Sequence, residues 1–189
     1  TDDGGQTWTI QESGTDLPLH GVSFVDASVG TVVGAVGTVL RTSDGGRTWD
    51  KQASGITDGL HSVSFTSRTT GTSIGGYNIL RTTDGGASWI PQTSPIRNFL
   101  YAVHFSDADN GTAVGVKGTI IHTTNGGETW IQQSSGTNAE LRGVFFTDPL
   151  NGTVVGWNGT ILRTTDGGAH WIKQTRMTSL NLYGVHFSD

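Results

Sequence analysis

Cysteine is absent from the 189 residues, which excludes disulfide bonds and thiolate metal sites. Basic residues are scarce: 11 Lys and Arg stand against 16 Asp and Glu, and no basic run occurs. This balance argues against nucleic acid as a partner, because such binding depends on neutralising phosphates. No apolar run is long enough to be a transmembrane segment. No window keeps an apolar period of 3.6 residues, so the sequence predicts no helix of useful length.

Repetition is what the chain has instead. A phrase that ends in tryptophan occurs five times, with 40 or 41 residues from one tryptophan to the next. Its copies read TDDGGQTW, TSDGGRTW, TTDGGASW, TTNGGETW and TTDGGAHW. A fixed period of this length indicates a repeat architecture, in which each repeat is one supersecondary unit.

The rest of each repeat reads as short strands. One apolar phrase recurs as LHGVSFVD, LHSVSFTS, LYAVHFSD, LRGVFFTD and LYGVHFSD, and a second as GTVVG, GTSIG, GTAVG and GTVVG. A third strand precedes each later tryptophan phrase, and a fourth begins at the tryptophan. Four short, β-branched strands per 40 residues are typical of a β-propeller blade, whereas solenoids of similar period need helices. The sequence therefore predicts an all-β propeller of four-stranded antiparallel blades.

The tryptophan phrase itself is interpreted as a hairpin turn. Asp-Gly and Asn-Gly favour tight turns because these need positive φ angles. Asp44 can accept hydrogen bonds from backbone N–H groups that follow it, and Gly46 tolerates a conformation that a side chain would penalise. Trp49 then opens the outer strand and is expected to be buried between neighbouring blades. The corresponding turn residues are Asp3, Asp44, Asp84, Asn125 and Asp166, and the tryptophans are Trp8, Trp49, Trp89, Trp130 and Trp171.

This phrase resembles the Asp-box, or bacterial neuraminidase repeat. The longer wording VGxxGTILRTTDGGxxW is similar to the photosystem II stability and assembly factor family of β-propellers, and the resemblance covers essentially the whole chain. It implies a propeller fold. For function it implies a non-enzymatic protein that assists assembly by binding another protein, in an extracytoplasmic location (periplasmic, thylakoid lumenal or secreted). Asp-boxes also occur in sialidases, so a carbohydrate-binding or glycosidase-type propeller is the alternative.

The period divides the chain into a single propeller, or a segment of one. Four complete blades are predicted at about 16–56, 57–96, 97–137 and 138–178, and residues 1–15 and 179–189 are predicted to contribute to a partial fifth. Either the chain is part of a longer array or a defective fifth blade closes the ring. The incomplete blade also raises self-association as an option, and it predicts that Trp8 is more exposed than the other repeated tryptophans.

Candidate chemistry is sparse. Identical turns in every blade cannot form one active site, so we interpret the turn aspartates as structural and predict no metal and no cofactor. A sialidase needs a Tyr–Glu pair, and none of the three glutamates, Glu12, Glu128 and Glu140, pairs with a tyrosine in a recognisable phrase. A paired-carboxylate mechanism on loop aspartates stays open. The histidines lack metal-ligand spacing. We therefore predict that the chain is not an enzyme.

Functional residues of a propeller are expected where the repeats differ. In a four-stranded meander, the turns between second and third strands and the connections from fourth to first strands lie at one end, which we call the top face. The variable residues predicted there are His20, His61, Tyr77, Tyr101, Lys117, Arg142, Trp157 and Tyr183. They are aromatic or polar, which suits a protein partner and leaves a glycan as an alternative.

Overall fold

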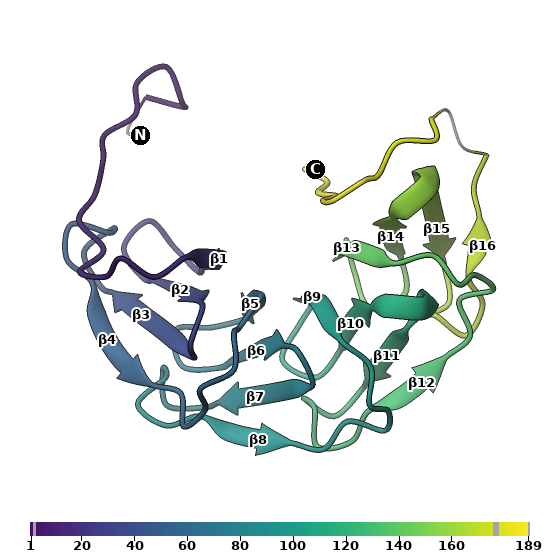
Figure 1. The fold of residues 1–189 in the computed structure, drawn as a ribbon, viewed down its shortest axis with the longest axis horizontal. Coiled ribbons are helices and arrows are strands. Elements are labelled where there is room, and N and C mark those ends of the chain that lie inside the picture. Colours follow the sequence, from purple (N-terminus) through teal and green to yellow (C-terminus); the bar gives the residue numbers. More distant parts are fainter. Residues whose placement is uncertain (2, 176–177, 189) are drawn as a thin grey trace.

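The computed structural model describes residues 1, 3–175 and 178–188 and consists of four antiparallel sheets of four strands each (Figure 1). Each sheet is one blade, and the prediction of an all-β propeller is confirmed. Blade 1 contains β1 (Leu19–Phe24), β2 (Gly30–Gly34), β3 (Thr38–Thr42) and β4 (Asp50–Ala53). Blade 2 contains β5 (Ser62–Phe65), β6 (Gly71–Gly75), β7 (Asn78–Thr82) and β8 (Ile90–Gln92). Blade 3 contains β9 (Leu100–Phe105), β10 (Gly111–Gly115), β11 (Ile120–Thr123) and β12 (Ile131–Gln133). Blade 4 contains β13 (Leu141–Phe146), β14 (Gly152–Gly156), β15 (Thr160–Thr164) and β16 (Ile172–Lys173).

The blades stand side by side along an open arc (Figure 1). The first strands β1, β5, β9 and β13 lie toward the centre, the last strands form the outer rim, and the two chain termini lie on either side of the gap. Short 3-10 turns, η1 (Val116–Gly118) and η2 (Trp157–Gly159), connect the second and third strands of blades 3 and 4. Within the described parts of 1–18 and 174–188 no strand forms, so the partial fifth blade is not a sheet.

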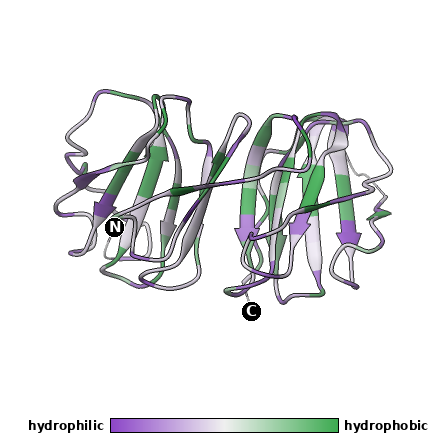
Figure 2. Ribbon diagram, turned by 90° about the horizontal axis from the view of Figure 1, so that it is seen from below, coloured by the Kyte–Doolittle hydropathy of each residue, from purple (hydrophilic) through white to green (hydrophobic). Residues whose placement is uncertain are grey.

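The core consists of three apolar clusters, and each lies between two neighbouring blades. Between blades 1 and 2, for example, Val33 and Val39 of one blade pack with Leu60, Val63 and Phe65 of the next. The strands β6 and β10 are buried along their whole length because a blade covers each of their faces. Strand β14 is buried as well, with blade 3 on one side and the C-terminal segment, whose Leu182 N–H donates to Gly156 O, on the other. Hydrophobic residues therefore concentrate on the strands and hydrophilic ones on the loops at both ends (Figure 2).

The tryptophan phrases form the predicted turns, stabilised by hydrogen bonds of their own side chains. In blade 1, Asp44 Oδ1 accepts from the Thr48 backbone N–H at 3.0 Å, and Asp44 Oδ2 accepts from the Thr48 hydroxyl at 2.7 Å. The Thr42 hydroxyl accepts from the Gly46 N–H at 2.8 Å. The pKa of Asp44 is lowered to about 2, mainly because of the two hydrogen bonds from Thr48. Asn125 makes the same bond to the N–H of Thr129, so the amide replaces the carboxylate as expected.

The burial of each repeated tryptophan depends on whether a neighbouring blade packs against it. Trp89 and Trp130 are only 7% and 5% exposed, whereas Trp8 is 79% exposed, as predicted. The expectation that Trp49 and Trp171 are largely buried is wrong, because both are half-buried. Trp49 contacts Phe24 of its own blade, with ring centroids 6.1 Å apart, and belongs to none of the three clusters between blades. Trp171 packs on Phe146 with ring centroids 5.9 Å apart but keeps part of its surface in solvent.

The last glycine of each second strand leaves room for the backbone that leads into the inner strand. A Cβ atom at Gly115 would lie 2.0 Å from the Phe99 carbonyl oxygen. The backbone of Gly115 is extended, with φ −165°, so the restriction is steric. We expect Gly115→Ala to lower the free energy of unfolding by about 1–3 kcal/mol in urea titrations, as overpacking does. Gly59→Ala is the control, because its nearest new contact would be 3.9 Å away. Equal losses in both variants would contradict the steric explanation.

Candidate functional site on the top face

Two kinds of connection meet at one end of the propeller, as predicted for the top face. The turn of blade 3 bonds to the loop before β9 through Val116 N–H and Phe99 O, at 3.0 Å. The turn of blade 4 bonds to the loop before β13 through Trp157 N–H and Glu140 O, at 2.8 Å. The aspartate turns bond to the turns between first and second strands at the opposite end, for example Gly45 N–H to Ser28 O at 2.8 Å.

Ring and guanidinium groups form a continuous series across the top face. The His20 and His61 rings lie 5.3 Å apart, and His61 lies 5.2 Å from the ring of Phe99. Phe99 lies 5.2 Å from Tyr101. The Arg142 guanidinium then stacks 3.6 Å from the centroid of Tyr101 and 5.2 Å from that of Trp157. We call this series the aromatic row; its members are His20, His61, Phe99, Tyr101, Arg142 and Trp157.

The row exists because each blade contributes residues at the start of its inner strand. His20 is the second residue of β1, Tyr101 of β9 and Arg142 of β13, and His61 directly precedes β5. Neighbouring inner strands pack against one another, so side chains about 40 residues apart in sequence become neighbours in space. Trp157 joins from η2, where the turn extends toward Arg142.

Arg142 is the fixed cation of the row. Its Nη2 donates to Glu140 Oε2 at 2.6 Å, and its side chain is 24% exposed. Two N–H donors at this point, Arg142 Nε and Trp157 Nε1, are buried and have no hydrogen-bond partner within the described protein. Buried donors normally have acceptors, so an acceptor atom of a ligand would be stabilised there.

The surroundings of two members of the row favour their uncharged forms. Burial lowers the pKa of His61, and the neighbouring His20 and Arg142 add to the shift. Burial also raises the pKa of Tyr101. The row therefore presents ring faces next to one guanidinium. Such a surface can stack on planar or apolar groups.

A hollow of about 420 Å³ adjoins the row on its outer side. Its lining includes Tyr77, Phe99, Lys117 and Glu140. Tyr77 is 59% exposed and its ring lies 5.9 Å from that of Phe99. The structure thus connects Tyr77 and Lys117 to the row. Tyr183 is different: it is 66% exposed on the C-terminal segment and joins none of the ring contacts among the described residues.

Phe99 and Glu140 are members of the site that sequence reasoning missed. Both directly precede the leucine that opens an inner strand, where the other repeats have Pro18, Gly59 and Asn181. This position differs between the repeats more than the positions we selected. The same criterion of variation would have found both residues if it had been applied one residue earlier.

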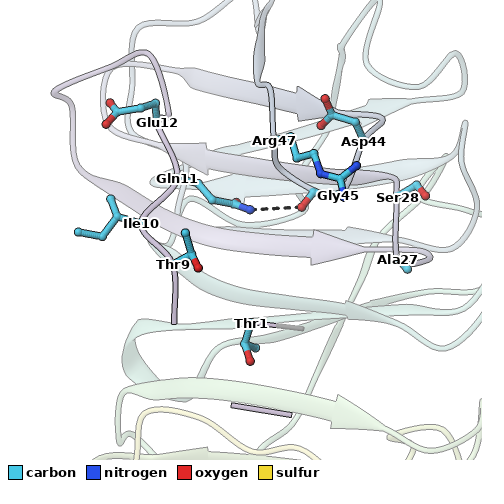
Figure 3. A pocket seen from close by; sticks show the side chains of 10 residues that line it. All are labelled: Thr1, Thr9, Ile10, Gln11, Glu12, Ala27, Ser28, Asp44, Gly45 and Arg47. Atoms are coloured by element: carbon cyan, nitrogen blue, oxygen red, sulfur yellow. Dashed lines mark hydrogen bonds between the residues drawn. The ribbon is translucent and has the colours of Figure 1, made fainter. Parts of the chain in front are cut away.

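A larger hollow, of about 580 Å³, lies at the opposite end of blade 1 (Figure 3). The N-terminal residues Thr9–Glu12 form one wall, and Asp44, Gly45 and Arg47 of the aspartate turn lie across from them. Gln11 Nε2 donates to Gly45 O at 3.4 Å inside it. Asp44 makes its hydrogen bonds within its own turn, to Thr42 and Thr48, and we assign no function to this hollow.

Metal-ligating residues do not gather anywhere in the described part of the chain: no group of three or more His, Cys, Asp or Glu could hold a metal ion. Likewise, within the described residues there is no helix of the length and apolarity that a membrane crossing requires.

Comparisons with known proteins found one family model and several solved structures that are similar to this chain. Residues 1–93 match the family model described as Photosynthesis system II assembly factor YCF48. No curated protein sequence matches the chain. The chain is similar in structure to YCF48 from Cyanidioschyzon merolae, with TM-score 0.72 and 25% identity over 92% of this chain and 61% of that one. It is also similar to a structure described as YCF48 bound to D1 peptide, with TM-score 0.74 and 24% identity over 93% of this chain and 59% of that one.

A third similar structure is an ancestral GH74 enzyme, with TM-score 0.71 and 15% identity over 88% of this chain and 25% of that one. At this identity the likeness concerns the fold alone. The chain spans about three fifths of the length of the two YCF48 structures. It is thus a propeller of the neuraminidase-repeat type that resembles the photosystem II assembly factor.

Proposed function

We propose that this chain is a non-enzymatic binding module that holds a segment of another protein on its top face, as an assembly factor does. The aromatic row carries the proposal. It collects exposed and half-buried rings and one arginine from all four blades, and aromatic residues and arginine are the types enriched at binding hot spots. The resemblance to YCF48, including a structure described as bound to a D1 peptide, supports a protein ligand. The same resemblance supports an extracytoplasmic location.

The binding mode follows from the geometry of the row. Successive rings about 5–6 Å apart offer a series of faces on which an extended segment can place successive side chains. Arg142 Nε and Trp157 Nε1 would donate to a carbonyl or carboxylate oxygen of that segment. Both buried donors would then have a hydrogen-bond partner. Glu140 keeps Arg142 in position and balances its charge when no ligand is present.

We expect Trp157→Ala to weaken binding of a D1 peptide by about 2 kcal/mol, the order of a hot-spot residue, or roughly 30-fold in Kd. The thermal midpoint should stay nearly unchanged, because Trp157 lies on a top-face turn and belongs to none of the three core clusters. Fluorescence anisotropy with a labelled peptide measures the first quantity and thermal melting followed by circular dichroism the second.

Trp8→Ala is the matched control, since Trp8 is exposed on an aspartate turn outside the row. Equal peptide affinity of the Trp157 variant and the wild type would contradict the proposed site. Unfolding of the Trp157 variant would identify a core residue instead. Binding of xyloglucan oligosaccharides in place of the peptide, lost in Trp157→Ala, would favour the carbohydrate alternative on the same surface.

A further inference from the structure

The hollow of about 420 Å³ beside the aromatic row is built by the three blades 2, 3 and 4. Tyr77 comes from the turn between β6 and β7, and Arg97 and Phe99 come from the loop that leads from β8 to β9. Lys117 comes from η1, and Glu140 from the loop that leads from β12 to β13. These blades pack against one another through two of the core clusters, so contacts between blades fix the shape of the hollow.

Two cations of the hollow are available to a ligand. Arg97 and Lys117 are both exposed, and neither forms an ion pair with any residue that the structure describes. The segments that carry them are joined to each other, because Asn98 Nδ2 donates to Thr119 Oγ1 at 2.8 Å. The two cations are therefore held on the same hollow although they come from different connections.

The one carboxylate of the hollow is already paired. Glu140 Oε2 accepts from Arg142 Nη2 at 2.6 Å, so its charge is balanced by the guanidinium of the aromatic row. Arg97 and Lys117 therefore give the hollow a positive charge, whereas the chain as a whole has a formal charge of −5. A local field opposite in sign to the net charge attracts anionic groups to this point.

The opposite end of the propeller is less favourable for an anionic segment. Hydrogen bonds within the aspartate turns lower the pKa values of Asp44, Asp84 and Asp166 to about 2, so these carboxylates are ionised at neutral pH. Arg41 and Arg81 reach the same end, but each donates to a backbone carbonyl group of the next blade. Charge therefore directs an acidic segment toward the top face.

An apolar wall adjoins the two cations. Tyr77 is 59% exposed and lies edge-on to Phe99, with ring centroids 5.9 Å apart. Aliphatic or aromatic side chains can pack on such rings. The hollow thus combines an apolar contact with two cations.

We propose that the hollow binds an acidic stretch of the partner protein. An Asp or Glu side chain of the stretch lies between Arg97 and Lys117, and a neighbouring apolar side chain packs on Tyr77 and Phe99. This inference rests on the proposed function, since the segment on the aromatic row continues into the hollow at Phe99 and Glu140. It adds the chemical class of that segment.

The row and the hollow have different tasks in this arrangement. Exposed charges at the rim of an interface set specificity, the rate of association and the dependence on salt more than they set affinity. Arg97 and Lys117 therefore select the partner, while the buried rings and the guanidinium of the row supply most of the binding energy.

The test is selection from a randomised peptide library displayed on phage. Every peptide is joined to the coat protein through its C-terminus, so no free terminal carboxylate is offered. The wild-type chain should enrich peptides in which Asp or Glu lies next to an aromatic or aliphatic residue. Arg97→Glu combined with Lys117→Glu should lose this enrichment and select peptides with Lys or Arg instead.

Lys51→Glu combined with Lys173→Glu is the matched control. Both lysines are exposed on outer strands, β4 and β16, and the pair of substitutions changes the net charge by the same amount. This variant should select the same acidic peptides as the wild type. Circular dichroism checks that both double variants are folded.

A selected peptide and its counterpart with Asn and Gln in place of Asp and Glu give the size of the effect. In fluorescence anisotropy at low salt the wild type should bind the acidic form roughly tenfold more tightly, as expected for two exposed ion pairs. The difference should shrink as the salt concentration rises, because exposed charges are screened. The variant with Arg97→Glu and Lys117→Glu should lose this preference for the acidic form.

The outcomes separate this inference from the proposed function. Peptides that bind the wild type and are lost in Trp157→Ala, but show no enrichment of Asp or Glu, would overturn the acidic specificity and leave the proposed function standing. Equal loss of acidic peptides in the control variant would assign the preference to net charge and overturn the hollow as its site. A wild type that selected no peptide, or bound polygalacturonate in place of peptides, would overturn both.

Discussion

Trp89→Ala should lower the free energy of unfolding by about 3–5 kcal/mol, the range for large aromatic truncations in a core. Trp89 is 7% exposed and lies edge-on to Phe65, with centroids 6.0 Å apart, in the cluster between blades 1 and 2. Its loss leaves a cavity lined by residues of both blades, because packed interiors relax only partly. Urea unfolding followed by circular dichroism measures the change.

Trp8→Ala is the control for this prediction. Trp8 ends the same phrase and follows the same hydrogen-bonded turn, in which Asp3 Oδ1 accepts from the Thr7 N–H at 3.0 Å, but it is 79% exposed. Its removal should change the free energy of unfolding very little. If both variants lost equal stability, the tryptophan would act through its turn, and the burial between blades would not explain its recurrence.

Acidification from about pH 6.5 to pH 4 should lower the free energy of unfolding by up to about 3 kcal/mol through His104 alone. This figure follows because each unit of difference between the folded and unfolded pKa corresponds to about 1.36 kcal/mol. Burial lowers the pKa of His104 from 6.5 to about 4, and His186 contributes a smaller part of the shift. In the unfolded chain His104 therefore binds a proton below about pH 6.5, whereas in the folded chain it binds that proton only below about pH 4. The free energy of unfolding consequently falls as the pH falls through this window.

The structure explains this sensitivity by a hydrogen bond between blades. His104 Nδ1 accepts from the Phe146 N–H at 3.3 Å, and a protonated Nδ1 could not accept it. In blades 1 and 2 a serine occupies this place: Ser23 Oγ accepts from Phe65 N–H at 3.0 Å, and Ser64 Oγ accepts from Phe105 N–H at 3.1 Å. His104→Ser should keep the bond and abolish most of the pH dependence between pH 6.5 and pH 4.

His170→Ser provides the comparison for the pH experiment. His170 is exposed beside Asp166 on an aspartate turn, and Ser88 occupies the corresponding place in blade 2. Urea unfolding at pH 7, 5.5 and 4.5 gives the free energy of unfolding of both variants and of the wild type, and its decrease toward pH 4.5 should become smaller in His104→Ser than in His170→Ser. If His104→Ser left the dependence of the unfolding free energy on pH unchanged, other groups would cause that dependence. His61 and His122 also have lowered pKa values.

The sequence by itself determined the blade, because the information lies within one repeat. The aspartate turn is the clearest case. Its hydrogen bonds join residues at most four positions apart, and the turn at Asp3 forms even though no sheet surrounds it. The strands follow from short β-branched phrases separated by such turns. The end of the propeller at which residues such as Arg142 and Trp157 lie could also be predicted, since the order of strands in a meander fixes it.

Only the tertiary structure decided which of those residues meet. The stack of Arg142 on Tyr101 and Trp157 and the position of Phe99 between His61 and Tyr101 depend on how far neighbouring inner strands lie apart. The partial exposure of Trp49 and the exposure of Val22 and Phe24 likewise depend on which blade has a neighbour. The physical reason is the same in each case. A repeat specifies its own strands locally, but it buries its faces only against another repeat, so burial and the top-face contacts arise when the blades pack together.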